Sequence, residues 1–214
     1  SYDISKANYS GDLERKDIFS DAGETTPTSL AFNNDGTKMF VLGMIGDFIY
    51  EYSLSTAFDV SSAIYDGDSE RFNISAQDGS PMSLAFNDDG TKMFMLGRAK
   101  DFINQYSLST PFDVSTSSYD SDSERKDISS EESSPSSLAF NLNGTKMFVM
   151  GTTGDDINEY TLSTGFDVST ASYDGDSERF SVAAQETSPS SLAFNNDGTK
   201  MFVLGSSDDD INQY

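Results

Sequence analysis

Short apolar segments recur along the chain in a fixed order, and polar turns separate them. In the first unit, "SLAF" (29–32) alternates small and large side chains, "KMFVL" (38–42) is apolar at consecutive positions, and "FIYEYSL" (48–54) follows a glycine-led loop. Consecutive apolar residues predict a strand buried on both faces, and the intervening "NNDGT" (33–37) predicts a tight antiparallel turn. A longer polar connection leads to a fourth predicted strand at 71–77.

This order of segments is repeated at a constant spacing. Phe32, Phe86, Phe140 and Phe194 are each 54 residues apart, and the phrase "AFNNDGTKMFVLG" returns around each of them with few changes. Four antiparallel strands per unit at fixed spacing are typical of propeller blades. We therefore predict an all-β protein, a β-propeller of four 54-residue blades. A β-solenoid is the alternative, but its rungs are shorter and its strands parallel.

The units divide the chain into a single predicted propeller domain, 1–214. Its blades are expected at approximately 28–76, 82–130, 136–184 and 190–214. The last unit stops after its third strand, and residues 14–20 match the missing fourth one. We expect this N-terminal strand to complete the last blade and close the ring, which removes an exposed sheet edge. Two alternatives stay open: a segment cut from a longer array, and an eight-bladed ring shared by two chains.

The segment "SPSSLAFNNDGTKMFVLG" (188–205) resembles the repeat of the YVTN and WD-repeat-like propeller superfamily. In that repeat a strand and an Asp-Gly turn are followed by a strand that begins with Lys. The resemblance covers all four units and implies the propeller fold. This chain departs from the pattern because Asn replaces the usual Ser-Pro before Asp-Gly. Its repeats are also longer, and the superfamily usually has seven or eight blades.

Composition limits the chemistry of this chain. It has no cysteine and no histidine, which excludes disulfides, thiolate metal sites and a histidine general base. The net charge of −23 makes nucleic acid and anionic membrane surfaces unsuitable partners. Self-association and a glycan or protein ligand remain as expected partners.

Loops that differ on a repeated scaffold are where recognition is expected. The units differ most between their second and third strands, and the alternative is that exposed loop tips drift freely. The candidate ligand-binding residues in these loops are Met44, Ile45, Arg98, Lys100, Thr152, Thr153, Ser206 and Ser207. Three N-x-S/T triplets are candidate glycosylation sites, at Asn8, Asn73 and Asn143.

Each of these loops ends in an aspartate, namely Asp47, Asp101, Asp155 and Asp209. Four carboxylates related by ring symmetry could bind a hard cation such as calcium on the ring axis. The alternative, which we favour, is that each aspartate caps its own turn. The acidic "DGDSE" stretches, as at 66–70, are interpreted as solvated turns, because they lack the later ligands of a calcium loop. No other cofactor is predicted.

The sequence favours a non-enzymatic role. It contains no G-x-S-x-G motif, and the near-identity of the blades leaves no asymmetric pair of acids. We expect an extracellular or virion- or cell-surface structural or binding module that could assemble into a fibre or larger array. The alternatives are a lectin-like propeller that binds glycans or cations, and a metal-dependent propeller hydrolase or lactonase.

Overall fold

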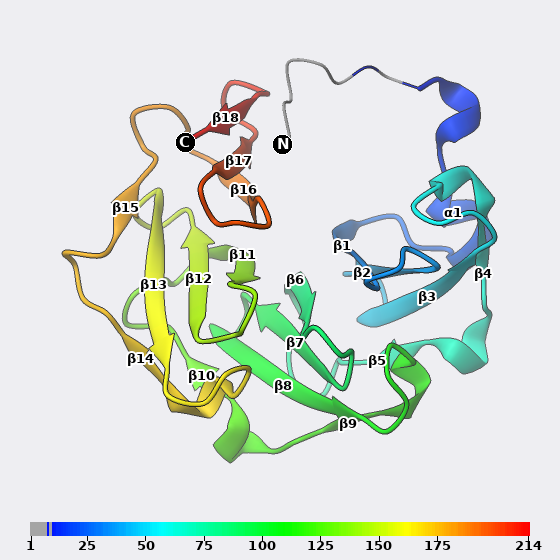
Figure 1. Cartoon of the computed structure of the whole chain (residues 1–214), viewed down its shortest axis with the longest axis horizontal. Coiled ribbons are helices and arrows are strands. Elements are labelled where there is room, and N and C mark those ends of the chain that lie inside the picture. The colour runs from blue at the N-terminus through cyan, green and yellow to red at the C-terminus, as the bar shows by residue number, and fades with distance from the viewer. Residues whose placement is uncertain (1–7, 9) are drawn as a thin grey trace.

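The computed structural model describes residues 8 and 10–214, and it shows four antiparallel sheets side by side around an arc (Figure 1). The prediction of an all-β, four-bladed propeller is confirmed. The strands of the first two blades are β1 (Pro27–Phe32), β2 (Lys38–Gly43), β3 (Phe48–Leu54), β4 (Ala63–Tyr65) and β5 (Phe72–Asn73), then β6 (Pro81–Phe86), β7 (Lys92–Gly97), β8 (Phe102–Leu108), β9 (Ser117–Tyr119) and β10 (Lys126–Asp127).

The third blade repeats this order and the fourth is shorter. Their strands are β11 (Pro135–Phe140), β12 (Lys146–Gly151), β13 (Asp156–Leu162), β14 (Ala171–Tyr173) and β15 (Phe180–Ser181), then β16 (Pro189–Phe194), β17 (Met201–Gly205) and β18 (Ile211–Gln213). The short helices are η2 (Asp12–Glu14), α1 (Ile18–Ala22), η3 (Val60–Ser62), η4 (Asp68–Glu70), η5 (Val114–Thr116), η6 (Asp122–Glu124) and η7 (Val168–Thr170). None of the described helices is long and apolar enough to cross a membrane.

The outer edge of each blade differs from the single fourth strand that the sequence predicts. In the first blade, β4 pairs with the second half of β3 and β5 pairs with its first half. The fourth position is therefore filled by two short pieces. The 3₁₀ turn η4 separates them, and η3 leads into β4. The Asp59 carboxylate caps η3 by accepting the N–H of Ser61.

The expected closure by residues 14–20 is not found within this chain. The fourth sheet contains only β16, β17 and β18, and α1 begins at Ile18 within the segment predicted as a strand. Ile18 instead packs against the outer core of the first blade, with Met39 and Tyr52. Figure 1 accordingly shows the first and fourth blades as the two ends of an arc.

The core lies between successive blades. Phe40 and Leu42 of β2 pack against Leu84 and Met95 of the second blade. The ring centroids of Phe40 and Phe86 are 4.6 Å apart, and the same pair recurs as Phe94 with Phe140 and as Phe148 with Phe194. The blades are therefore held together by one interface used three times.

Polar side chains add to each blade interface. The Ser29 hydroxyl accepts the backbone N–H of Leu84 at 3.1 Å, and the equivalent bond recurs from Leu138 to Ser83 and from Leu192 to Ser137. Lys38 and Lys92 donate to backbone carbonyls of the following blade, at Phe112 and Phe166. These directional bonds fix how one blade sits on the next.

Candidate active site

A buried carboxylate joins two loops at the same end of every blade. Glu24 precedes β1, and its Oε1 accepts the N–H of Thr26 at 2.6 Å and that of Ile45, in the β2–β3 loop, at 3.4 Å. Asp78 likewise accepts N–H groups from Ser80 and Lys100. At most 1% of each side chain's surface is exposed, and the four members of this set are Glu24, Asp78, Glu132 and Glu186. These groups hold the loops and cannot reach a ligand.

A glycine at the end of each second strand makes room for this carboxylate. A Cβ on Gly43 would lie 2.0 Å from Glu24 Oε2, and one on Gly97 would lie 2.3 Å from Asp78 Cγ. Sequence reasoning missed the four acids, although their constant spacing of 54 residues was a usable signal. Because acids are frequent in this chain, that signal did not stand out.

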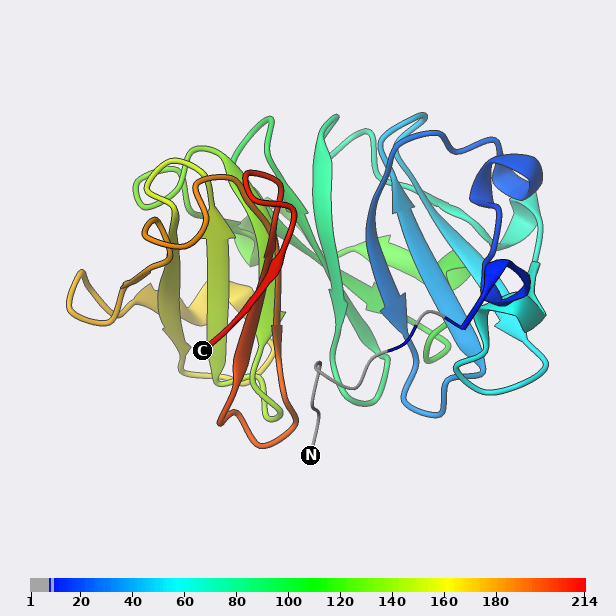
Figure 2. The same cartoon turned by 90° about the horizontal axis from the view of Figure 1, so that it is seen from above.

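The eight candidate ligand-binding residues lie at this end of the blades, on loops that backbone hydrogen bonds hold in place. Backbone N–H groups of Met44, Arg98, Thr152 and Ser206 each donate to the loop that leads into the same blade. Figure 2 shows the strand-connecting loops gathered on two opposite faces of the arc. Met44 and Arg98 are half-buried, and the exposed members of the set are Ile45, Lys100, Thr152, Thr153, Ser206 and Ser207. Any role for these residues in binding a ligand stays a prediction.

The four aspartates of these loops share an unusual backbone conformation. Their φ angles lie between 50° and 55°, in the left-handed region that Asp tolerates better than most residues. The carbonyl oxygen of Asp47 accepts the N–H of Ile74 at 2.8 Å, and Asp101 and Asp155 do the same for Ile128 and Val182. The aspartates thus lie in turns, but Oδ1 of Asp47, Asp101 and Asp155 has no hydrogen-bond partner, so the expected side-chain cap is not observed there.

The geometry does not gather these aspartates around one ion. In the described part of the chain, no three acidic side chains are grouped as ligands for a metal. The acidic turn at 66–70 instead forms local contacts, since Asp68 accepts from the Tyr65 hydroxyl at 3.0 Å and pairs with Arg71 at 3.2 Å. Both Asn73 and Asn143 use their side-chain oxygen to accept from the residue two positions later, and Asn8 is exposed.

Two of the loop aspartates have perturbed acidity. Burial raises the pKa of Asp47, and the negative charges of Asp78 and Glu24 raise it further. Burial also raises the pKa of Asp101, with Asp78 and Glu132 adding to the shift and Arg98 opposing it. The Oδ1 atom of each aspartate is buried and has no hydrogen-bond partner. The charge of Asp78 therefore raises the pKa of two half-buried carboxyl groups, those of Asp47 and Asp101.

Comparison with solved structures places this fold among the propellers. No model of a protein family and no curated protein matches the sequence, whereas many solved structures match the fold. A proposed 6-phosphogluconolactonase from Bacteroides uniformis matches with a TM-score of 0.60 at 13% identity, over 88% of this chain and 50% of that one. The periplasmic gluconolactonase of Pseudomonas aeruginosa matches with a TM-score of 0.53 at 13% identity, over 87% and 49%.

A third match is the β-propeller domain of Cps50 (Swd1) from Myceliophteria thermophila, with a TM-score of 0.52 at 11% identity over 87% of this chain and 52% of that one. The resemblance to WD-repeat-like propellers is thus confirmed at the level of the fold. The chain spans about half the length of these solved structures.

These matches correct the expected function. The sequence predicts a non-enzymatic structural or binding module, but the similar structures include a periplasmic gluconolactonase and two proposed 6-phosphogluconolactonases. That expectation rested on missing histidine, on missing catalytic motifs and on the near-identity of the blades. Carboxylates alone can supply acid–base chemistry when their surroundings shift their pKa values, so neither absence excludes an enzyme.

Proposed function

We propose that this chain forms part of a propeller hydrolase of the lactonase type, which opens an uncharged cyclic ester. The likeness to several lactonase propellers carries the proposal. Asp47 and Asp101 supply its chemistry, because both have a raised pKa and both lie half-buried on the loop face. Because one fold hosts many functions, a proposed reaction must rest on specific residues. Asp47 and Asp101 are the residues on which this one rests.

In the proposed reaction an ionised aspartate, at Asp47 or Asp101, removes a proton from a water molecule as the water oxygen attacks the lactone carbonyl carbon. The carbon–oxygen bond of the ring then breaks, and the leaving ring oxygen takes the proton from the same carboxyl group. A raised pKa makes the ionised carboxylate a stronger base. Arg98 acts on the charge of Asp101 and is the candidate for stabilising the oxyanion.

The charge of the chain favours a neutral substrate over a phosphorylated one. The chain carries 36 acidic and 13 basic residues, so the field around it repels phosphate esters. An uncharged sugar lactone approaches without this penalty. We extend the proposal to a periplasmic or extracellular location, which is supported by the periplasmic gluconolactonase among the similar structures.

The test measures hydrolysis of glucono-1,5-lactone above its spontaneous rate, with the phosphorylated lactone as the comparison. We expect turnover of the neutral lactone, and Asp101→Asn or Asp47→Asn should lower kcat/KM by roughly a hundredfold, as loss of a general base does. Asp209→Asn is the matched control, because Asp209 has the same backbone conformation but an exposed side chain. Absence of turnover, or equal losses in all three variants, would refute the proposal.

A further inference from the structure

The two ends of the arc expose surfaces that are buried everywhere else in the molecule. Leu204 in β17 is 43% exposed, whereas its equivalents Leu42 and Leu96 are fully buried against the next blade. At the other end, Leu30 in β1 is 55% exposed, whereas Leu84 and its later equivalents are at most 6% exposed. Ile211 in β18 is also exposed, unlike Ile49 and Ile103. Each end therefore presents one half of the repeated blade interface.

These halves are complementary, because they are copies of surfaces that already pack together three times. Within the chain, Phe40 packs against Phe86 and Phe112 of the next blade. The corresponding residues at the two ends are Phe202 on the fourth blade and Phe32 with Phe58 on the first. Phe58 is 58% exposed and contacts the Phe32 ring of its own blade. The hydrogen bond from Leu84 to Ser29 has its counterpart in Leu30 of one end and Ser191 of the other.

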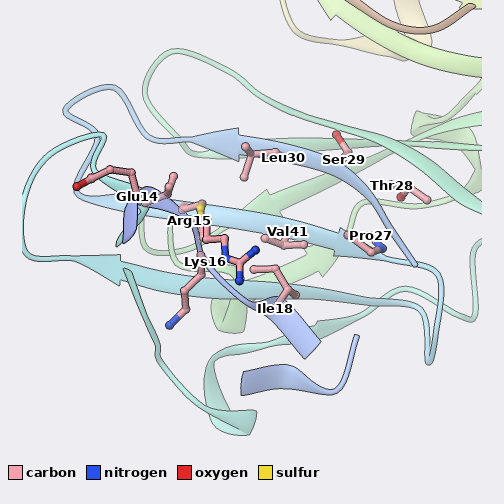
Figure 3. Close-up of a pocket in the computed structure, with 11 residues that line it drawn as sticks. Glu14, Arg15, Lys16, Ile18, Pro27, Thr28, Ser29, Leu30 and Val41 are labelled. Carbon is pink, nitrogen blue, oxygen red and sulfur yellow. The ribbon is translucent and has the colours of Figure 1, made fainter. Parts of the chain in front are cut away.

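A cavity marks where the first blade would receive a neighbour. It has a volume of about 490 Å³, and it lies between residues 14–18 and the outer face of β1 and β2 (Figure 3). Ile18, Leu30 and Val41 are among the apolar side chains that line it. Figure 3 shows the Arg15 and Ile18 side chains on the N-terminal segment, opposite Leu30 and Val41.

The N-terminal segment already occupies the place of a preceding blade's last strand. Ile18 packs against the first blade as Ile74 packs against the second and Ile128 against the third. In the complete blades the residue two positions earlier pairs with the third strand, as Phe72 pairs with Ile49. By the same register, Lys16 would pair with Ile211 of a fourth blade. The first blade therefore has the last strand of a preceding blade beside it, but not the three inner strands of that blade.

We propose that a second copy of this chain occupies both ends, so that two arcs close head to tail into one eight-bladed ring. The fourth blade of one copy packs on the first blade of the other, and residues 14–18 of the second copy complete its outer edge. The curvature supports this occupant, because the arc superposes on about half of each longer propeller. A head-to-tail contact that repeats after half a turn closes with twofold symmetry and leaves neither end free. This inference is independent of the proposed catalytic activity.

The first experiment is sedimentation velocity of the 214-residue chain, which should give twice the chain mass of 23.3 kDa. Leu204→Asp and Leu30→Asp should each raise the dissociation constant by on the order of a hundredfold, as loss of a buried anchor does. Leu142→Asp is the matched control, since Leu142 is 65% exposed in a turn between β11 and β12 and should change nothing. Mixing the two interface variants should restore dimers, because one wild-type contact remains between unlike copies.

A cross-link distinguishes this ring from its competitors. The chain has no cysteine, so Ser191→Cys with Leu30→Cys introduces a unique pair. Oxidation should produce a covalent dimer, whereas the control pair Ser137→Cys with Leu192→Cys should cross-link within one chain. An intrachain product from the first pair would show a closed four-bladed ring and overturn the proposal. A persistent monomer without a cross-link, or an open series of larger assemblies, would overturn it as well.

Discussion

The acidic residues of this protein differ in their surroundings, and these surroundings distinguish buried supports from partly exposed carboxyl groups. Glu24 and Asp78 are fully buried and accept backbone N–H groups, so they act as internal supports for loops. Asp47 and Asp101 are half-buried and each has a carboxyl oxygen without a partner. A buried, unpartnered oxygen disfavours the ionised form. Acidic residues on neighbouring loops of one blade thus have different surroundings.

Asp101 should lower the free energy of unfolding at neutral pH. Its folded-state pKa is raised by burial and by the charges of Asp78 and Glu132, so the folded chain holds the proton more tightly than the unfolded chain. Stability should therefore fall as pH rises from the ordinary aspartate value of about 3.9 through the raised folded-state value. Asp101→Asn removes this loss and should be more stable than the parent at pH 7, with the difference vanishing below the ordinary value.

Urea unfolding between pH 3 and pH 8 measures this effect. Asp209→Asn provides the control, because the side chain of Asp209 is exposed and should show little pH-dependent difference. A variant of Asp101 that gains stability while losing lactone hydrolysis would identify a site where activity is maintained at the expense of stability. Lower stability of Asp101→Asn at pH 7 would contradict the argument.

At the scale of elements, each blade forms its own hydrogen-bonded sheet. Its apolar side chains, however, are buried mainly by contact with the neighbouring blades. The second strand of an inner blade, such as β7, is buried on both faces because one face meets the preceding blade and the other meets the following one. The outer pieces β4 and β5 contribute few ladder pairs. The same strand therefore has a different environment at the end of the arc, which is why β17 is more exposed than β7.

The bridging serine should have different effects inside the arc and at its end. Ser83→Ala removes the acceptor for the Leu138 N–H, a buried bond between the second and third blades. Leaving that donor without a partner should lower the free energy of unfolding by roughly 1–3 kcal/mol. Ser191→Ala makes the same change on the fourth blade, where it should weaken association and leave the unfolding of the isolated chain almost unchanged.

Urea unfolding at low protein concentration and sedimentation at high concentration separate these two effects. The two serines differ in their surroundings and not in their place in the repeat, so each variant is the control for the other. Equal losses of folding stability in both variants would mean that the end surface is covered within one chain. That outcome would also count against the two-chain ring.

At the scale of the whole molecule, net charge affects both folding and the association of two copies. The net charge of −23 is spread over repeated blades, so it opposes both the compact state and the joining of two copies. The blade interfaces must overcome this repulsion through apolar burial and directional hydrogen bonds. Screening by salt should therefore favour the folded, closed form.

We expect the thermal midpoint of unfolding to rise by several degrees between 10 mM and 500 mM NaCl, because the Debye length shrinks from about 30 Å to below 10 Å. Circular dichroism measures the midpoint, and KCl at equal ionic strength is the control for specific ion effects. Calcium chloride at matched ionic strength tests the calcium expectation, since a specific site would add a further shift. A midpoint that does not move with salt would contradict the electrostatic argument.

Local patterns in the sequence predicted much of this molecule. The consecutive apolar residues of "KMFVL" and the Asn-Asp-Gly turns identified the strands, and the 54-residue period identified the blades, because hydrophobic alternation and turn chemistry act over a few residues. The same reasoning placed Asp47 and its equivalents in turns. Repetition further implied that one kind of interface is used throughout.

Only the tertiary structure decided how strongly the arc of blades curves and which acidic residues are buried as supports. The buried supports such as Glu24 did not stand out among 36 acidic residues, because their burial arises from packing between loops that are distant in the chain. The predicted closing strand at 14–20 matched its repeat in sequence but packs on the first blade, not the fourth. Curvature is the sum of small rotations at every interface, and no local pattern encodes that sum.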